Sequence, residues 1–514
     1  MSDVSSRPAP LSSLPGSLSA NPRLGQWLRF DASGYVELCP GKVEIGQGII
    51  TALTQIAAEE LDVDPARIRL KAPNTAESPN EGVTSGSLSI QDSGSAIRHA
   101  SAQAREIYVA AAAEKLGVDP SALTVDDGAI LGPDNLASSY WELADDTLLD
   151  RAASLDVHKK VSAQRVISGK SMPRLDIPEK VFGEPRFIHD RLQADILHGR
   201  IVRPASPAAH LKTFDDTRAR AVPDVAGIVR DGNFLGVIAQ SEHAAGKAAG
   251  LLRSDCTWHE NATLPDEYTL NDWLRSVPTD TNIVASRGEP GSGRNVRTIR
   301  HDFTRPFTAH ASIGLCCAAA RWDNGKLHVW THCQGIYNLR ADLALIFKIP
   351  EEDVVCEHME GAGCYGHNGA DDVSLDAALL ARAVPGQKVR VLWSREEELA
   401  WGPVSPAMAV TVEADLDDSG EIVEWRHDVW SNGHATRPGR ASVPTLLSAF
   451  HMDNEFEPVV AGNMPLKTGG GADRNAVPAY NYPAYTITNH RLLEMPVRTS
   501  ALRSLGATAN VFSI

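Results

Sequence analysis

The alternation of strands and helices between Lys326 and Arg395 constrains the fold more than any other feature of the sequence. Apolar and polar residues alternate from Leu327 to Cys333, which is typical of a strand, and the apolar residues from Ile336 to Phe347 follow a helical spacing. The chain then continues with a second strand, a glycine-rich loop, a second helix and a third strand, at 353–359, 360–372, 373–383 and 389–393. This order predicts parallel strands joined by right-handed helical crossovers.

Two loops of this block are expected to face one ligand. The carboxyl ends of parallel strands lie at one edge of a sheet, which would bring Gln334 and the loop 360–372 to a common site. Helix N-termini at that edge offer free N–H groups, which favour an anionic ligand. The glycines of the loop allow its backbone to approach a ligand closely, although simple packing of a turn is the alternative.

The loop also contains G-x-G-x-x-G, at Gly361–Gly366, which is the pattern of dinucleotide-binding turns. Residues 367–372 prolong the loop where such a turn would already be helical. They also place Asp371 and Asp372 where a pyrophosphate requires positive potential, and no acidic residue ends the next strand at the expected distance. An NAD(P)-dependent dehydrogenase is therefore an alternative that rests on this pattern alone.

The same order of elements recurs near the N-terminus. The turn Gly46–Gly48 interrupts a strand predicted at 35–45. A helix, a proline, a strand, a loop of small and polar residues and a long helix follow at 49–61, Pro65, 68–72, 74–89 and 94–116. Gln47 corresponds in this order to Gln334, so we infer two related halves that face one ligand. Independent halves with the same local order are the alternative.

Composition limits the classes of partner. At 514 residues the chain is long enough for more than one domain, and its net charge of −16 argues against nucleic acid or an anionic membrane surface as the main partner. None of the seven cysteines forms a C-x-x-C pair, so no zinc ribbon or iron–sulfur run is recognisable, and their odd number favours the reducing cytoplasm. No apolar run reaches about 18 residues, so no membrane span is expected.

Several short motifs together resemble those of the molybdopterin-binding large subunit of the xanthine oxidase family of molybdenum hydroxylases. The branch is that of the isoquinoline 1-oxidoreductases, nicotinate dehydrogenases and aldehyde dehydrogenases. The motifs are GKVEIGQG, PNEGVTSGS, VFGEPRFIHD, HGRIVRPASP, THCQGIY, EGAGCYGHNGADD and VRTSALRSLGA. Each is weak alone, but their joint occurrence over nearly the whole chain is specific.

The resemblance implies a role for each loop. Gln334, followed by Gly335, matches the glutamine that hydrogen-bonds an oxo group on molybdenum. The loop beside the metal is filled by Gly363, Cys364, Tyr365 and Gly366, with tyrosine in place of the family's phenylalanine. The pterin-contacting turn and the small-residue loop over the cofactor are matched by Gly46, Gln47 and Gly48 and by Ser85, Gly86 and Ser87.

A further pair of residues matches the family near its substrate. Leu502 and Arg503 correspond to a Phe-Arg pair, with Arg503 at the cofactor and Leu502 beside Tyr365 in the substrate pocket. Leucine in place of phenylalanine implies a different pocket wall. The chain provides no recognisable metal ligands of its own: the histidines at 310, 332, 358 and 367 lack ligand spacing and are expected to be hydrogen-bonded structural groups or surface groups.

The resemblance implies an oxidoreductase that oxidises an aldehyde or an N-heterocyclic small molecule, with water as the oxygen source. The implied cofactor is molybdenum–molybdopterin in its cytosine dinucleotide form. Because the chain has no cluster-binding cysteine run, electrons are expected to leave through [2Fe–2S] clusters on a small partner subunit, with a cytochrome or FAD subunit as a further acceptor. The expected location is the cytoplasm, or the periplasm if the chain is exported with a partner that carries the signal.

The family also implies a division into domains. The expected fold is a multidomain α/β and α+β fold, with cofactor-binding domains built from βαβ units and a small α+β hammerhead domain. The predicted parts are a disordered lead, a first molybdopterin-binding segment, the hammerhead-like domain, a Pro/Gly-rich linker and the main molybdopterin-binding domain, at 1–20, 21–165, 175–265, 278–295 and 296–514.

The main departure from the family concerns catalysis. The family's catalytic glutamate belongs to a glycine-flanked motif beyond anything that matches Ile514, so no catalytic residue is assigned here. The chain is therefore expected to be a C-terminally truncated large subunit. The alternative is a catalytically inactive fragment that acts at most as a binding or assembly module.

Overall fold

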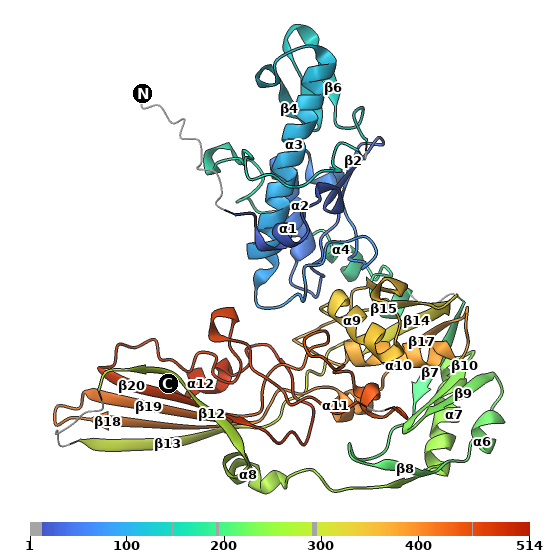
Figure 1. The fold of residues 1–514 in the computed structure, drawn as a ribbon, viewed down its shortest axis with the longest axis vertical. Coiled ribbons are helices and arrows are strands. Elements are labelled where there is room, and N and C mark those ends of the chain that lie inside the picture. Colours follow the sequence, from blue (N-terminus) through green and yellow to red (C-terminus); the bar gives the residue numbers. More distant parts are fainter. Residues whose placement is uncertain (1–12, 146, 192–194, 290–295, 455) are drawn as a thin grey trace. The chain divides into compact units, whose positions relative to one another are not determined.

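A computed structural model describes residues 13–145, 147–191, 195–289, 296–454 and 456–514 (Figure 1). The chain divides into two compact units. The first consists of Met1–Arg191, Gln334–Arg340 and Val355–Glu360, and the second of Leu192–Cys333, Ala341–Val354 and Gly361–Ile514. Helix α9 (Ile336–Phe347) and strand β16 (Val354–His358) contain residues of both units.

The first unit is built around two helices and two small sheets. Its elements up to the long helix are α1 (Gly16–Ala20), β1 (Leu28–Asp31), β2 (Tyr35–Leu38), α2 (Ile49–Leu61), β3 (Ile68–Leu70) and α3 (Ser95–Leu116). They are followed by β4 (Thr124–Asp126), β5 (Ala129–Leu131), β6 (Ala137–Ser139), α4 (Ile177–Val181) and α5 (Ile188–Arg191). Strand β2 lies between an antiparallel β1 and a parallel β3, so α2 is the crossover of a βαβ unit.

Helix α2 has the bounds that the sequence predicts. It begins after Gly48 and ends at Asp62, two residues with positive φ (83° and 55°), which a continuing helix does not permit. Its apolar face packs against α3 (Figure 1), with Leu53, Ala57 and Ile97 fully buried in the core. Strand β2 ends at Leu38, earlier than the predicted 35–45, because the residues that follow hydrogen-bond to loop groups instead of to a neighbouring strand.

The stretch 118–165 contains the antiparallel sheet β4-β5-β6. One prediction for the first unit needs correction. Residues 16–20 of the predicted disordered lead form α1, whose Leu18 is fully buried, whereas residues 1–12 lie outside the described residues. Burial of Leu18 therefore fixes residues 16–20 in a helix, although the composition of the N-terminal segment is typical of disorder.

One sheet of the second unit has the strand order β15-β14-β17-β7-β10-β9 (Figure 1). The strands are β7 (Ile196–Ile201), β9 (Val225–Asp231), β10 (Phe234–Ala239), β14 (Cys317–Asp323), β15 (Lys326–Thr331) and β17 (Lys388–Leu392). Helix α10 (Ala370–Arg382) packs on β14 and β17. Gly199 and Gly236 lie under it, where an added Cβ would meet Leu380 at 2.5 and 2.7 Å.

The expected parallel pairing within this sheet was partly wrong. Strand β14 lies between β15 and β17 and pairs antiparallel with both. The predicted strands β15 and β17 therefore run in the same direction but do not pair with each other. Strand β17 pairs parallel with β7. The sequence Cys317–Ala320 has no alternation of polar and apolar residues, because both faces of β14 are buried there, and periodicity therefore missed the strand.

Smaller elements accompany this sheet. They are β8 (His210–Thr213), α6 (Thr217–Arg220), α7 (Glu242–Asp255), β11 (Thr257–His259) and α11 (Arg395–Trp401). Helix α7 begins at Ser241, whose side chain accepts from the Ala244 N–H, and it packs on β10. Strands β9 and β10 pair antiparallel.

A second sheet of this unit has the order β12-β20-β19-β18-β13. Its strands and the nearby helices are β12 (Thr279–Arg287), β13 (Arg297–Arg305), β18 (Met408–Leu416), β19 (Ile422–Ser431), β20 (Ala484–Leu492), α8 (Leu270–Ser276) and α12 (Ala507–Ser513). Strands β18 and β19 form an antiparallel hairpin. The linker predicted at 278–295 is wrong for 279–287, which form β12; residues 290–295 lie outside the described residues.

Proline and glycine at 278 and 288 only flank β12, which explains the error about the linker. The final helix, α12, begins only at Ala507. Ser504 and Leu505 have positive φ (73° and 54°), so residues before 507 cannot continue a helix. Within the described ranges, no helix has both the length and the apolar character needed to cross a lipid bilayer.

Candidate functional site

The turn Gly46–Gly48 of the first unit is organised by a buried carboxylate. Glu44 is 4% exposed, and its Oε1 accepts hydrogen bonds from the Gly46 and Gly48 N–H groups at 2.8 and 3.0 Å. Its Oε2 accepts from the Ile50 N–H at 3.2 Å. The carboxylate therefore occupies the N-terminus of α2, where an anionic ligand was expected.

The side chain of Gln47 is also engaged within its own turn. Its Nε2 donates to the Val43 carbonyl at 2.8 Å, and its Oε1 accepts from the Ile45 N–H at 2.7 Å. Both ends of the amide thus stabilise the turn, which remains exposed at Gly46 and Gln47. Glu44 is a residue that sequence reasoning missed, and the signal that could have found it is an acidic residue just before a Gly-x-Gly turn that opens a helix.

We expect Glu44→Ala to lower the free energy of unfolding by about 2 kcal/mol, because three N–H groups at the start of α2 would lose their acceptor. Urea denaturation of the purified protein measures this difference. Glu37→Ala is the matched control, since Glu37 forms only a partly exposed ion pair with Lys71 at 3.4 Å and should change stability by less than about 0.5 kcal/mol. Equal effects of the two substitutions would contradict the capping role.

Gln334 joins the small-residue loop of the first unit. Its carbonyl accepts from the Thr84 N–H at 2.8 Å, and its Nε2 donates to the Thr84 carbonyl at 2.9 Å. Gly335 packs on Val83, where an added Cβ would lie 2.9 Å from a methyl group. Two of the sequence-predicted loops, one from each half, are therefore held side by side by Gln334.

The loop that follows Thr84 presents free backbone donors. Gly86 and Ser87 have positive φ (69° and 61°), and the Leu88 N–H donates to the Ser85 carbonyl at 3.4 Å, which defines a tight turn. Among the described residues, no group accepts a hydrogen bond from the N–H of Ser85, Gly86 or Ser87. Successive exposed N–H groups of this kind form a concave site for an anionic or polar ligand atom.

The glycine-rich loop of the second unit is held by its carbonyls. The Ala362 carbonyl accepts from the Gly314 N–H at 2.7 Å, and the Tyr365 carbonyl accepts from the Arg503 N–H at 2.7 Å. In the part of the chain that the structure describes, the N–H groups of Gly363, Cys364, Tyr365 and Gly366 donate to no residue. The loop therefore offers donors to a ligand while its acceptors are used by the fold.

Strained backbone gives this loop its shape. Gly363, Tyr365 and Gly366 have φ values of 90°, 66° and 142°, and a non-glycine residue such as Tyr365 rarely adopts a positive value. An added Cβ at Gly363 would lie 3.0 Å from the Tyr365 hydroxyl, and one at Gly366 would lie 2.1 Å from the Ala501 carbonyl oxygen. Glycine is thus required at 366 for close packing as well as for conformation.

The segment 501–503 pairs directly with the loop. Gly366 and Leu502 form an antiparallel bridge, and the His367 N–H donates to the Ala501 carbonyl at 2.7 Å. The guanidinium of Arg503 lies over the Tyr365 ring, 5.3 Å from its centroid. Residues separated by more than a hundred positions in the sequence, but assigned to one site by the family motifs, are therefore neighbours.

Two buried histidines contact the paired segments. The two ring nitrogens of His310 lie 3.0 and 3.1 Å from the Ala501 and Pro403 carbonyl oxygens. Burial lowers the pKa of His310 to about 4, so the ring is neutral at pH 7 and donates through one nitrogen. His367 contacts the Ser500 hydroxyl at 2.7 Å through Nδ1 and Asp371 at 3.0 Å through Nε2. Both histidines are buried and contact polar groups of the surrounding fold.

Cys364 is a protonated thiol. Burial raises its pKa, and its Sγ donates to the Gly366 carbonyl at 3.2 Å. Within the described residues, no group of three or more His, Cys, Asp or Glu side chains is arranged to hold a metal ion. What the loops provide are neutral backbone and amide donors, which suit a large polar organic ligand with many acceptor atoms.

The candidate residues thus fall into two sets. Gly46–Gly48, Ser85–Ser87, Gln334 and Gly335 belong to the first unit, whereas Gly363–Gly366, Leu502 and Arg503 belong to the second. Each set is assembled by its own contacts. The expectation that Gln334 and the glycine-rich loop face one common site stays a prediction.

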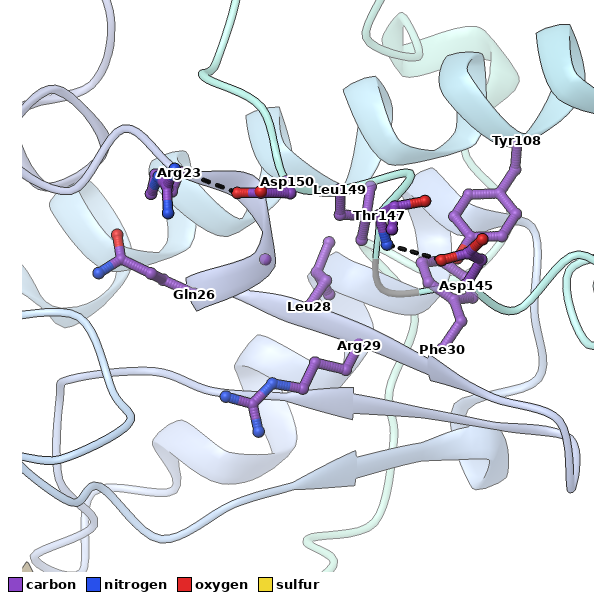
Figure 2. A pocket seen from close by; sticks show the side chains of 11 residues that line it. Arg23, Gln26, Leu28, Arg29, Phe30, Tyr108, Asp145, Thr147, Leu149 and Asp150 are labelled. Atoms are coloured by element: carbon purple, nitrogen blue, oxygen red, sulfur yellow. Dashed lines mark hydrogen bonds and ion pairs between the residues drawn. The ribbon is translucent and has the colours of Figure 1, made fainter.

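A separate pocket of the first unit lies outside these loops. Figure 2 shows this cavity of about 520 Å³, with Phe30 and Tyr108 in its wall. Its charged groups are already engaged: Arg23 pairs with Asp150 at 3.2 Å, and Asp145 accepts from the Thr147 N–H at 2.8 Å (Figure 2). Nothing in its lining adds to the candidate site.

Comparison with known families points to one cofactor. Two family models, each described as a molybdopterin cofactor-binding domain, match residues 11–173 and 279–458. The two ranges contain the Gly46–Gly48 turn, the Ser85–Ser87 loop, Gln334 and the glycine-rich loop. The segment around Arg503 lies beyond the second match.

Two similar proteins carry the names of oxidoreductases that act on N-heterocycles. One component of the nicotinate dehydrogenase of Pseudomonas putida is 32% identical over 95% of this chain and 41% of its own length. The beta chain of the isoquinoline 1-oxidoreductase of Brevundimonas diminuta is 24% identical over 86% of this chain and 63% of its own length. The chain therefore spans less than two thirds of each relative.

Solved structures share the fold. Aldehyde oxidoreductase from Desulfovibrio gigas aligns over 100% of this chain and 58% of its own, with a TM-score of 0.51 and 15% identity. Quinoline 2-oxidoreductase from Pseudomonas putida 86 aligns over 66% of this chain and 46% of its own, with a TM-score of 0.51 and 18% identity. Both likenesses support the predicted mixture of α/β and α+β domains.

Proposed function

The chain belongs to the molybdopterin-binding large subunits of the xanthine oxidase family, and we propose that it binds a molybdenum–molybdopterin cofactor and oxidises an aldehyde or an N-heterocyclic compound. The observation that carries the proposal is the presence of free N–H groups in two motif loops, Ser85–Ser87 and Gly363–Gly366. Donors without a protein acceptor fit a ligand that is rich in acceptor atoms.

The residues that would hold the cofactor are those of both sets. Backbone donors of the two loops and the guanidinium of Arg503 would bind its polar atoms, while Gln334 and Gly335 position the small-residue loop. Because Glu44 fills the N-terminus of α2, the Gly46–Gly48 turn would contact the cofactor through Gly46 and Gln47 at its exposed surface, without an anion at the helix end. When bound, the cofactor supplies the centre that accepts electrons from the substrate.

Electrons would leave through [2Fe–2S] clusters of a small partner subunit and pass to a cytochrome or FAD subunit. The seven cysteines of this chain are all buried. Water would supply the oxygen, the cofactor would be the cytosine dinucleotide form, and the complex would work in the cytoplasm, or in the periplasm if exported with its partner. Residues 21–165 and 296–514 would form the cofactor-binding domains and 175–265 the hammerhead-like domain.

We expect Arg503→Ala to lower the molybdenum bound per chain about five-fold, because an exposed guanidinium that stacks on Tyr365 would be lost from the cofactor loop. Arg503→Lys, which keeps the charge but not the planar stack, should lower it about two-fold. Metal analysis of purified protein measures both. Arg300→Ala, which removes a guanidinium on an exposed β13 position, is the control, and wild-type molybdenum in Arg503→Ala would contradict the assignment.

The reaction itself is tested with the complete complex. Cells grown with tungstate in place of molybdate should give protein that no longer oxidises aldehydes or N-heterocycles with an artificial electron acceptor. In ¹⁸O-labelled water, the product of the molybdate-grown protein should carry the label. Product labelled from O₂ alone, or full activity after growth on tungstate, would exclude the proposed function.

A further inference from the structure

A second cavity of about 680 Å³ lies in the second unit, and its lining includes none of the candidate cofactor or substrate residues. Its aromatic and aliphatic walls come from the segment before β14, from α11, from the turn after Leu446 and from the segment before Thr499. The principal apolar lining residues are Phe307, Leu399, Trp401, Phe450, Met495 and Val497. A volume and lining of this kind fit a small, largely apolar organic molecule.

One polar side chain in the wall has unused hydrogen-bonding capacity. His451 packs edge-on against Trp401, with ring centroids 6.0 Å apart and planes at 83°. Its backbone carbonyl accepts from the N–H groups of Asn233 and Phe234, which fixes the residue in place. Neither ring nitrogen of His451 bonds to any residue in the described ranges. An imidazole held this rigidly can donate to or accept from a heteroatom of a ligand.

The charges around the cavity indicate a neutral occupant. The guanidinium of Arg498 pairs with buried Asp372 at 2.9 Å, and that of Arg203, behind Trp401, pairs with buried Asp376 at 2.6 Å. Burial lowers the pKa of His451 to about 4, so the imidazole is uncharged at neutral pH. An anionic ligand would lose its hydration without gaining a free counter-charge in the walls, and the acidic lining residue Glu457 is exposed to solvent.

We propose that this cavity binds an uncharged planar heteroaromatic molecule, with its rings against Phe307, Trp401 and Phe450 and one ring heteroatom hydrogen-bonded to His451. The cavity is connected through the backbone to the candidate cofactor segment, because Val404 in its wall bridges Thr499, two residues before Ala501. The site would hold the substrate class of the proposed function before or during reaction, and only in that respect does it rest on the proposed function.

Two probes of equal shape test the proposal. Quinoxaline carries two ring nitrogens, whereas naphthalene carries none. Ligand-observed NMR titration of the full chain should show saturable binding of both probes, with quinoxaline about five-fold tighter, which corresponds to one neutral hydrogen bond. Failure of both probes to bind, or equal affinity for the two, would overturn the proposal.

Two variants locate the site. His451→Phe keeps a ring against Trp401 but has no nitrogen, so it should bind both probes with the affinity that the wild type shows for naphthalene. Val497 is a half-buried residue of the cavity wall. Val497→Phe would fill the cavity and should abolish binding of both probes, whereas the control Val460→Phe, at an exposed residue outside the cavity, should not. A five-fold preference that survives in His451→Phe, or wild-type binding by Val497→Phe, would overturn the assignment.

The test separates this site from the proposed reaction. Binding needs no cofactor, so a preparation without molybdenum that binds quinoxaline supports the cavity whether or not oxidation is ever observed. An active molybdenum-containing preparation that does not bind quinoxaline would overturn the cavity and leave the proposed function standing. If Val497→Phe melts at a lower temperature than the control, His451→Phe alone decides.

Discussion

Asp376→Ala should lower the free energy of unfolding by about 3–5 kcal/mol, the range for breaking a buried ion pair by removing one partner. The carboxylate of Asp376 is fully buried on α10 and accepts from Arg203 at 2.6 Å, from the Trp393 indole at 2.7 Å and from the Ser448 hydroxyl. Its loss leaves a buried guanidinium and an indole N–H unpaired. Urea denaturation of the purified protein measures the change.

Asp323→Ala is the matched control for this prediction. Asp323 also pairs with an arginine, Arg321, at 3.1 Å, but its side chain is 53% exposed, so the substitution should change stability by less than about 0.5 kcal/mol. Asp376→Asn keeps the shape and one acceptor and should fall between the two. A loss of less than about 1 kcal/mol for Asp376→Ala would show that other contacts hold α10 to the segments that contain Arg203, Trp393 and Ser448.

Gly366→Ala should have the second largest effect, about 3 kcal/mol, together with loss of the bound cofactor. Its Cβ would lie 2.1 Å from the Ala501 carbonyl oxygen, a backbone atom that cannot move without opening the pairing of residues 365–367 with 501–503. The φ of 142° adds strain for any residue with a side chain. Thermal unfolding and metal content, measured on the same samples, report the two consequences.

Gly386→Ala separates strain from collision. Gly386 also has a positive φ, of 80°, but an added Cβ would meet nothing within 4 Å. This control should lose only about 1 kcal/mol, the difference between alanine and glycine in left-handed backbone, and should keep its molybdenum. Similar molybdenum content in the two variants would mean that the pairing of the glycine-rich loop with 501–503 does not matter for the cofactor.

Residues that begin or end helices made some elements predictable from local sequence. Helix α2 was predicted to the residue because Gly48 opens it and a polar stretch before Pro65 closes it. Strands β12 and β14 were not predicted, since a flanking proline and glycine hid the first and burial on both faces removed the alternation of the second.

The candidate residues were grouped by family motifs, and local sequence gave little indication of them. The pairing of Gly366 with Leu502 is a contact between distant segments, and no periodicity in one sequence encodes it. The capture of the Gly46 and Gly48 N–H groups by Glu44 was missed because a carboxylate before a glycine turn is read locally as an exposed polar residue. His451 was missed because its significance depends on the cavity around it.

Molybdenum and pterin content, measured together on protein purified with its partners from cells supplied with molybdate, tests the account most directly. The two loops with free N–H groups predict about one molybdenum and one pterin for each chain, since the protein supplies binding and the cofactor supplies the chemistry. Preparations that oxidise substrate while containing neither molybdenum nor pterin would contradict it.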